Sequence, residues 1–156
     1  MARYAVSNTL GGTQQAISTA YKSLVILTAA TATLTSAKVF EFGLGTNGTP
    51  AENALEWIVE RQTAAGTATA ITPNALNSVN RAAGTVGAAN ATAEGTITAN
   101  SALFYKGIHQ RASYRWVASP DSELIIPATN LAGFAFRAKS PTGYVGTATL
   151  DAKFEE

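Results

Sequence analysis

A chain of 156 residues with 11 basic and 10 acidic side chains and no cysteine has the size of one ordinary domain. Its near-neutral charge provides no basic field to hold a phosphate backbone, so we expect no nucleic acid among its partners. The lack of cysteine excludes disulfides, thiolate metal sites and thiol nucleophiles, and it suits a protein made in a reducing cytoplasm.

Large apolar side chains are scarce in this sequence. Leu, Ile, Val and Phe together number 33, whereas Ala and Thr number 31 and 21. Because a core of small side chains buries little area per residue, we expect contacts between subunits to supply part of the stability. Met1–Gln15 carries no apolar run and Leu24–Leu27 is far shorter than a membrane span, so we expect neither a secretory signal nor a membrane partner.

Turn-forming residues punctuate the sequence roughly every 8 to 12 residues, and β-branched and aromatic residues fill the intervals. The predicted strands are, in chain order, Ala2–Val6, Lys22–Leu27, Lys38–Leu44, Leu55–Gln62, Ala68–Ile71, Gly95–Ala99, Leu103–Ile108, Tyr114–Ala118, Leu124–Ile126, Gly133–Ala138 and Tyr144–Phe154. Without a long amphipathic helix between them, this spacing predicts an all-β fold, a jelly roll or two-sheet antiparallel β-sandwich.

Local patterns add three expectations. Alternation places Phe40, Phe42 and Leu44 on one face of a strand. The unbroken apolar run Leu124–Ile126 is typical of a strand that is covered on both sides. The segment Thr13–Tyr21 has room for one helical turn.

Asn74–Asn100 interrupts the strand pattern. These 27 residues are mostly Ala, Gly, Thr, Asn and Val, with almost no large side chain. The composition predicts a long loop, although loops of that length are uncommon in compact domains. We expect the segment either to be mobile or to lie against another subunit or partner.

Groups that could perform catalysis are few and scattered. His109 is the single histidine, and Ser113, Ser119, Asp121 and Glu123 follow it. One histidine cannot hold a metal alone, and no strained nucleophile turn contains these serines. We interpret His109 as a strand-end residue that is hydrogen-bonded to backbone or solvent. We predict that the chain is not an enzyme and has no catalytic, cofactor-binding or metal-ligating residues.

Two further patterns do not indicate a site. Glu56 and Glu60 share one face of a predicted strand about 13 Å apart, too far for a glycosidase pair, and we expect them to pair with Arg61 or Arg137. The glycine-rich Gly43–Gly48 lacks the pattern of a phosphate-binding loop and predicts a hairpin-like turn.

Asn47 and Asn90 each begin an Asn-x-Thr glycosylation pattern, which we attribute to chance in a threonine-rich chain. A basic and aromatic cluster is more informative. It consists of Tyr105, Lys106, Arg111, Tyr114, Arg115 and Trp116. Such a cluster could stack sugars or bases or meet an acidic protein surface, or it could be core aromatic residues with outward-pointing arginines.

Several short segments carry a resemblance. Leu55–Pro73 contains the pattern R-Q-T-x-x-G-T-x-x-x-x-T-P and resembles small head proteins of tailed bacteriophages, in which such a segment links two strands. Ser119–Pro120, Glu123–Pro127 and Phe154–Glu156 resemble closing segments of the same family. The likeness covers roughly Ser36–Glu156.

The resemblance implies a jelly-roll decoration, or cement, protein on the outer surface of a phage head, without catalytic residues. Residues 36–156 would form the jelly-roll domain, and residues 1–35, which fit least well, an N-terminal strand or arm packed on this single domain. The implied partners are the major capsid protein and further copies of the chain in a homotrimer. The implied location is the virion, on the outer capsid surface, after synthesis in the host cytoplasm. The alternative is a receptor- or carbohydrate-binding module of a head fibre or tail, which depends on the basic and aromatic cluster.

Overall fold

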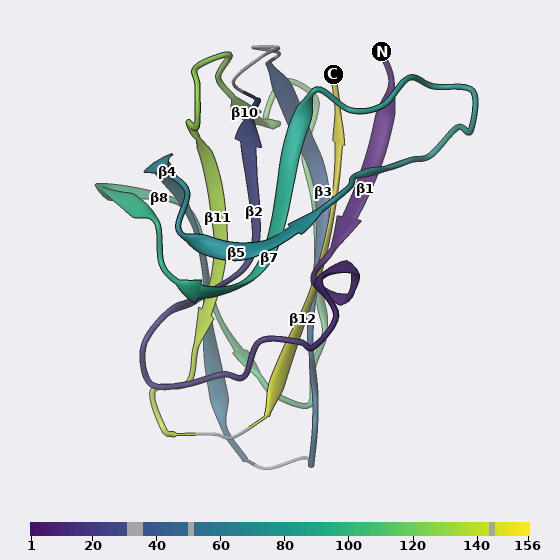
Figure 1. Cartoon of the computed structure of the whole chain (residues 1–156). Coiled ribbons are helices and arrows are strands. Elements are labelled where there is room, and N and C mark those ends of the chain that lie inside the picture. Colours follow the sequence, from purple (N-terminus) through teal and green to yellow (C-terminus); the bar gives the residue numbers. More distant parts are fainter. Residues whose placement is uncertain (31–35, 50–51, 144–145) are drawn as a thin grey trace.

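The computed structural model describes residues 1–30, 36–49, 52–143 and 146–156, and nearly all of their regular structure is β (Figure 1). A 3₁₀ helix, η1, spans Asn8–Gly11. The strands are β1 (Arg3–Ser7), β2 (Lys22–Ala29), β3 (Ala37–Asn47), β4 (Ala54–Ala64), β5 (Thr67–Ile71), β6 (Asn74–Ala75), β7 (Thr85–Ala93), β8 (Thr96–His109), β9 (Tyr114–Val117), β10 (Leu124–Ile126), β11 (Gly133–Lys139) and β12 (Thr147–Glu155).

Two antiparallel sheets form a sandwich. Sheet A has the order β10–β3–β12–β1–β6, with β9 also paired to β3, and sheet B has the order β5–β7–β2–β11–β4–β8. β1 pairs with β12, so the two ends of the chain lie side by side (Figure 1). The predicted all-β fold of two antiparallel sheets is confirmed. No helix in the described part of the chain is long and apolar enough to cross a membrane.

The core lies between the sheets, and strand alternation selects its residues. The buried residues of β12 are Ala148, Leu150, Ala152 and Phe154. On β3, the ring of Phe42 stacks on Trp116 with 4.9 Å between centroids. The same ring meets Phe104 and Phe136 edge-on at 5.0 and 5.5 Å. Aromatic residues from both sheets therefore meet around Phe42.

A β-bulge changes which residues of β3 face the core. The register with β12 shifts between Lys153 and Phe154, and Val39 and Phe42 are buried while Phe40 is partly exposed beneath the Arg3 guanidinium. The prediction that Phe40 shares the face of Phe42 is wrong, because a bulge adds one residue to strict alternation.

The strand that is covered on both sides is β2, not β10. Ile125 is 49% exposed, since β10 lies at the edge of sheet A and nothing in the described part of the chain covers its outer face. Ser23–Ala29 is buried throughout, and β2 lies in the interior of sheet B between β7 and β11.

The predicted loop over Asn74–Asn100 is wrong, because most of this segment is strand. β6 pairs with β1, β7 lies between β5 and β2, and β8 begins at Thr96. Ala89 and Ala91 on β7 are fully buried. The backbone hydrogen bonds of a ladder need no large side chain, so a strand whose small residues pack beneath its neighbours has no strong apolar pattern. The predicted break between Ala99 and Leu103 is also absent, because β8 is continuous.

No helical turn forms at Thr13–Tyr21. Its backbone pairs instead with the start of β12, where the Ile17 N–H donates to Gly146 at 2.9 Å and Gln15 accepts from the Ala148 N–H at 3.4 Å. These groups are then unavailable for helical hydrogen bonds. The one described helix, η1, lies just before this segment, and the Ser7 hydroxyl caps it.

Residues 1–30 belong to the sandwich itself and are not an appended arm. β1 lies between β12 and β6 in sheet A, and β2 lies inside sheet B. The rest of the expected N-terminal segment, residues 31–35, lies outside the described residues. So do Tyr144 and Val145 at the start of the predicted strand Tyr144–Phe154.

One long antiparallel ribbon bends across sheet B. β4 pairs with β8 and β5 pairs with β7, so residues 54–71 run against residues 85–109. The connection from β4 to β5 meets the connection from β7 to β8 at Gly66 and Gly95. A Cβ on Gly66 would collide with the Ala93 carbonyl, and a Cβ on Gly95 with the Ala64 carbonyl. Glycine at both positions permits the close approach.

Candidate functional site

The outer face of sheet A contains a hollow of about 320 Å³, here called the Gly43 hollow. Its lining residues are Glu41, Gly43, Leu44, Gly45, Ser113, Tyr114, Arg115, Thr149 and Asp151. The outward positions of β3 are Glu41, Gly43 and Gly45, and β9 and β12 flank β3 on its two sides. Two successive outward glycines leave the backbone of β3 as the floor.

Strand register sets the walls of the hollow. Gly43 pairs with Arg115 on β9 and with Asp151 on β12, so a guanidinium and a carboxylate flank it on opposite sides. Thr149 pairs with Gly45 in the next row. The Asp151 carboxylate leans over the floor, because a Cβ on Gly43 would lie 2.5 Å from its Oδ1.

Glu41 orients the charges at one end of the hollow. Its Oε1 accepts from Nε of Arg115 at 2.9 Å and from Nζ of Lys153 at 2.8 Å. These hydrogen bonds, with the two positive charges, lower the pKa of Glu41 from 4.5 to about 2. The side chain of Glu41 is 13% exposed, so Arg115 is held by a largely buried anion.

Two groups in the hollow remain available to a ligand. The Asp151 carboxylate makes no hydrogen bond or close ion pair within the described part of the chain and attracts Arg115 only across a longer distance. The Arg115 guanidinium uses only its Nε toward Glu41. Hydrogen-bond donors therefore face an acceptor across a glycine floor, and the charges of Glu41, Asp151, Arg115 and Lys153 sum to zero. This arrangement can bind a polar group but contains no nucleophile paired with a base.

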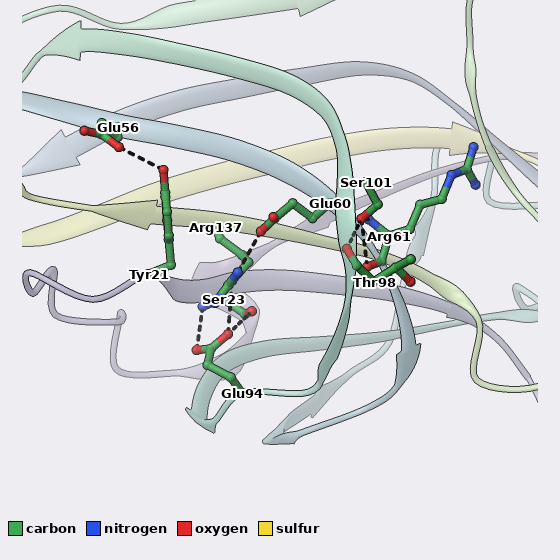
Figure 2. Close-up of polar contacts among 9 residues, drawn as sticks. All are labelled: Tyr21, Ser23, Glu56, Glu60, Arg61, Glu94, Thr98, Ser101 and Arg137. Atoms are coloured by element: carbon green, nitrogen blue, oxygen red, sulfur yellow. Dashed lines mark hydrogen bonds and ion pairs between the residues drawn. The ribbon is translucent and has the colours of Figure 1, made fainter.

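The outer face of sheet B carries a second polar cluster, the Arg137 network. Arg137 on β11 lies between Glu60 of β4, at 2.6 Å from Nη1, and Glu94, at 3.3 Å from Nε (Figure 2). Glu94 also accepts from the Ser23 N–H at 2.9 Å and from its hydroxyl at 2.5 Å. Glu94 belongs to the turn between β7 and β8, so the network fastens the bend of the ribbon to β2 and β11. We assign it a structural role.

Tyr21 and Glu56 form a neighbouring pair on the same face. The Tyr21 hydroxyl donates to Glu56 at 2.9 Å, and Nζ of Lys139 lies 3.0 Å from the same carboxylate (Figure 2 shows the tyrosine contact). Burial, and then the hydrogen bond to Glu56, raise the pKa of Tyr21. The hydrogen bonds from Lys139 and Tyr21 lower the pKa of Glu56. The predicted ion pair of Glu60 with Arg137 is confirmed, whereas Glu56 pairs with Lys139.

Arg61 pairs with neither glutamate and lies over the ring of Phe134 at 5.4 Å.

His109 is the last residue of β8, which agrees with its interpretation as a strand-end residue. Its Nδ1 accepts from the Arg111 N–H at 3.2 Å, and its Nε2 lies 3.3 Å from Glu52, a contact that no sequence pattern predicts.

The other residues named with His109 do not gather around it. Within the described part of the chain, no hydrogen bond or ion pair joins it to Asp121, Glu123, Ser113 or Ser119. Among the described residues, no three His, Asp or Glu side chains are grouped so that they could hold a metal ion.

The basic and aromatic cluster is divided between the two sheets. Tyr105 and Lys106 lie on β8 in sheet B, and Tyr105 is 55% exposed. Tyr114 and Trp116 lie on β9 in sheet A and pack against the core, with the Tyr114 ring 5.7 Å from Phe104. Arg115 points outward into the Gly43 hollow.

Arg111, the last member of the cluster, pairs with Glu52 at 2.9 Å. The cluster therefore combines partly buried aromatic rings with outward arginines, one of the two interpretations left open.

The structure also bears on two further sequence patterns, and the turn predicted at Gly43–Gly48 is wrong. Gly43–Gly48 is not a turn as a whole, because β3 continues to Asn47 through its pairing with β12 and only Gly48, with a φ of +135°, lies beyond it. Asn90 is buried and its amide is hydrogen-bonded, so it is not an accessible glycosylation site.

Thr149 and Asp151 were not foreseen as site residues. The one local signal for the hollow is the alternation of Glu41 with two glycines, which removes side chains from one face of a strand.

Comparisons of the chain with protein-family models, with curated proteins and with solved structures find no match.

Proposed function

We propose that this chain is a structural virion protein, a capsid decoration protein that binds the outer surface of a phage head and stabilises contacts between major capsid protein subunits. Its support is the resemblance of Leu55–Pro73 and the closing segments to small phage head proteins, together with a two-sheet sandwich of the expected class. Location on the outer capsid surface follows from the same proposal.

The observation that carries the proposal is the exposure of large apolar side chains on a loop and on edge strands. Leu76 and Val79 are 52% and 84% exposed in the loop after β6, which extends away from the sandwich beside the N-terminus (Figure 1). Val117 and Ile125 are exposed on β9 and β10, which both pair with the same edge of β3. Apolar groups on loops and strand edges suit contact with a large protein surface better than enclosure of a small molecule.

The test is co-sedimentation of the purified protein with undecorated heads, followed by measurement of the heat resistance of the heads. We expect the protein to sediment with the heads and to raise their disruption temperature. Leu76→Asp and Val79→Asp together should weaken attachment, while Thr98→Asp, on the exposed start of β8, should not. A failure of the unaltered protein to sediment with heads would overturn the proposal.

We also propose a homotrimer, whose subunit number comes from the resemblance alone. Small residues at the surface allow backbones to approach closely, and a closed cyclic arrangement ends growth at a fixed number of copies. Light scattering at micromolar concentration should give a trimer mass. A monomer mass with a concentration-independent melting transition would contradict it.

The alternative is a receptor- or carbohydrate-binding module, and the structure changes what supports it. Tyr114 and Trp116 are partly buried and pack against Phe104 and Phe42, so part of each ring is unavailable to a ligand. Only Tyr105 of the three aromatic residues is largely exposed. The alternative now rests on Arg115 and the polar hollow that it borders.

A further inference from the structure

The Gly43 hollow is a concave polar site that attachment to a capsid does not require. Its floor is backbone, its walls come from three strands paired in register, and one wall carries a carboxylate that makes no hydrogen bond in the described part of the chain. A glutamate that is largely buried holds the opposing guanidinium in place. These features constrain the chemistry of a ligand that binds here.

Charge narrows the chemistry of that ligand. The carboxylates of Glu41 and Asp151 disfavour phosphate, sulfate and other anions, whereas Arg115 and Lys153 disfavour a cation. Glu41 accepts hydrogen bonds from both cations and offsets one of their charges, and Asp151 offsets the other, so the four groups together are electrically neutral. A neutral ligand therefore fits best.

The volume of the hollow and the polar groups in its walls restrict the ligand further. A volume of about 320 Å³ is near the lower end of the range for small-molecule pockets, which suits a single small ring. The backbones of β9 and β12 lie on opposite sides of β3, about 9–10 Å apart by ordinary strand spacing, so a ring between them can reach both walls. Ser113, Arg115, Thr149 and Asp151 contribute polar atoms to the walls, so a ring that carries several hydroxyls can make hydrogen bonds on more than one side.

We propose that the Gly43 hollow binds one sugar ring of a neutral saccharide. Each sugar hydroxyl can both donate and accept. Hydroxyls on one side of the ring donate to the Asp151 carboxylate, and hydroxyls on the other side accept from the terminal nitrogen atoms of Arg115. Glu41 is a positioning residue that fixes Arg115. This inference deepens the alternative function and does not depend on capsid attachment.

Saturation-transfer difference NMR of the full chain tests the proposal with glucose, galactose, mannose and N-acetylglucosamine, each at millimolar concentration. We expect transfer to at least one of these sugars. Asp151→Ala should reduce that signal at least tenfold, and Gly45→Val, which fills the floor, should abolish it. Glu123→Ala, which removes a carboxylate outside the hollow, should leave it unchanged.

Two outcomes would overturn the inference: no transfer to any of the four sugars, or equal transfer in the chain with Asp151→Ala. Circular dichroism of each variant shows whether a lost signal reflects unfolding, and Arg115→Met provides a second removal that leaves Lys153 to pair with Glu41. Tighter binding of an oligosaccharide than of its monosaccharide would identify a polysaccharide as the source of the ligand, and equal binding a free sugar. Co-sedimentation with heads, measured in parallel, separates failure of this site from failure of the decoration role.

Discussion

Asn8 and Asn90 are joined by hydrogen bonds across one edge of the sandwich. Nδ2 of Asn90 donates to the Asn8 carbonyl oxygen at 2.9 Å, and Nδ2 of Asn8 lies 3.4 Å from Oδ1 of Asn90. The Asn8 amide also donates to the Ala148 carbonyl at 2.8 Å and accepts from the Leu150 N–H at 3.0 Å. Buried amides with satisfied hydrogen bonds thus connect η1, β7 of sheet B and β12 of sheet A.

We predict that Asn8→Ala lowers the free energy of unfolding by about 1–3 kcal/mol, because it leaves the Leu150 N–H and the Ala148 carbonyl buried without a partner. Urea titration followed by circular dichroism measures the change. The matched control is Asn77→Ala, which removes an exposed turn residue whose Oδ1 accepts from the Val79 N–H at 3.2 Å. Its cost should stay within about 0.5 kcal/mol, and equal costs for the two variants would contradict the prediction.

Gln62 and Gln110 are buried amides with opposite hydrogen-bonding states. Neither polar atom of the Gln62 side chain has a partner within the described part of the chain. Gln110 donates to the Thr49 carbonyl at 3.1 Å and lies 3.5 Å from the Asn53 amide. We predict that Gln62→Leu raises the free energy of unfolding by about 1–3 kcal/mol, whereas Gln110→Leu lowers it. Thermal melts of both variants test the opposite signs, and a lower melting temperature for Gln62→Leu would refute the first.

The close approach of Gly66 and Gly95 predicts that neither position tolerates a larger residue. Gly66→Ala and Gly95→Ala should each destabilise the fold by about 1–3 kcal/mol, because the added methyl group meets backbone that cannot move aside without breaking strand pairing. Gly107→Ala on β8 is the control, since its Cβ would point into open space. That change should be neutral or stabilise by up to about 1 kcal/mol. Chemical denaturation measures the free energy of unfolding of the three variants. A similar loss of stability in all three would contradict the prediction.

Glu41 makes the stability of the fold depend on pH below about 4.5. Its pKa is about 2 in the folded chain against an ordinary value of 4.5, so its contribution is complete above pH 4.5 and is lost as the pH falls toward 2. Glu41→Gln should therefore be less stable than the unaltered chain at pH 7, and the difference should shrink between pH 4.5 and 2. Urea midpoints across this range measure it. A deficit for Glu41→Gln that stays constant across this range would exclude the predicted coupling.

The strands that the sequence predicted well are those with large residues in alternation. β11 and β12 could be found because rings or aliphatic side chains recur at every second position, as at Phe134 and Phe136 or at Leu150 and Phe154. β7 could not be predicted from the sequence, because its buried residues are mostly small and have no strong apolar pattern. The bulge at Phe40 could not be predicted either, because it depends on the register with β12, more than a hundred residues away in the chain.

The sequence by itself determined the all-β class and the positions of most strands, because alternation and turn residues are local signals. It left open whether Glu56 and Glu60 pair with Arg61 or Arg137, which the pairing of β4 with β11 decided. The tertiary structure alone decided the bend at Gly66 and Gly95, the contacts of Asn8 with Asn90 and the hollow between Arg115 and Asp151. Each of these depends on which distant strands pair and in which register. A shift of one residue in that register would turn every side chain of a strand to the opposite face.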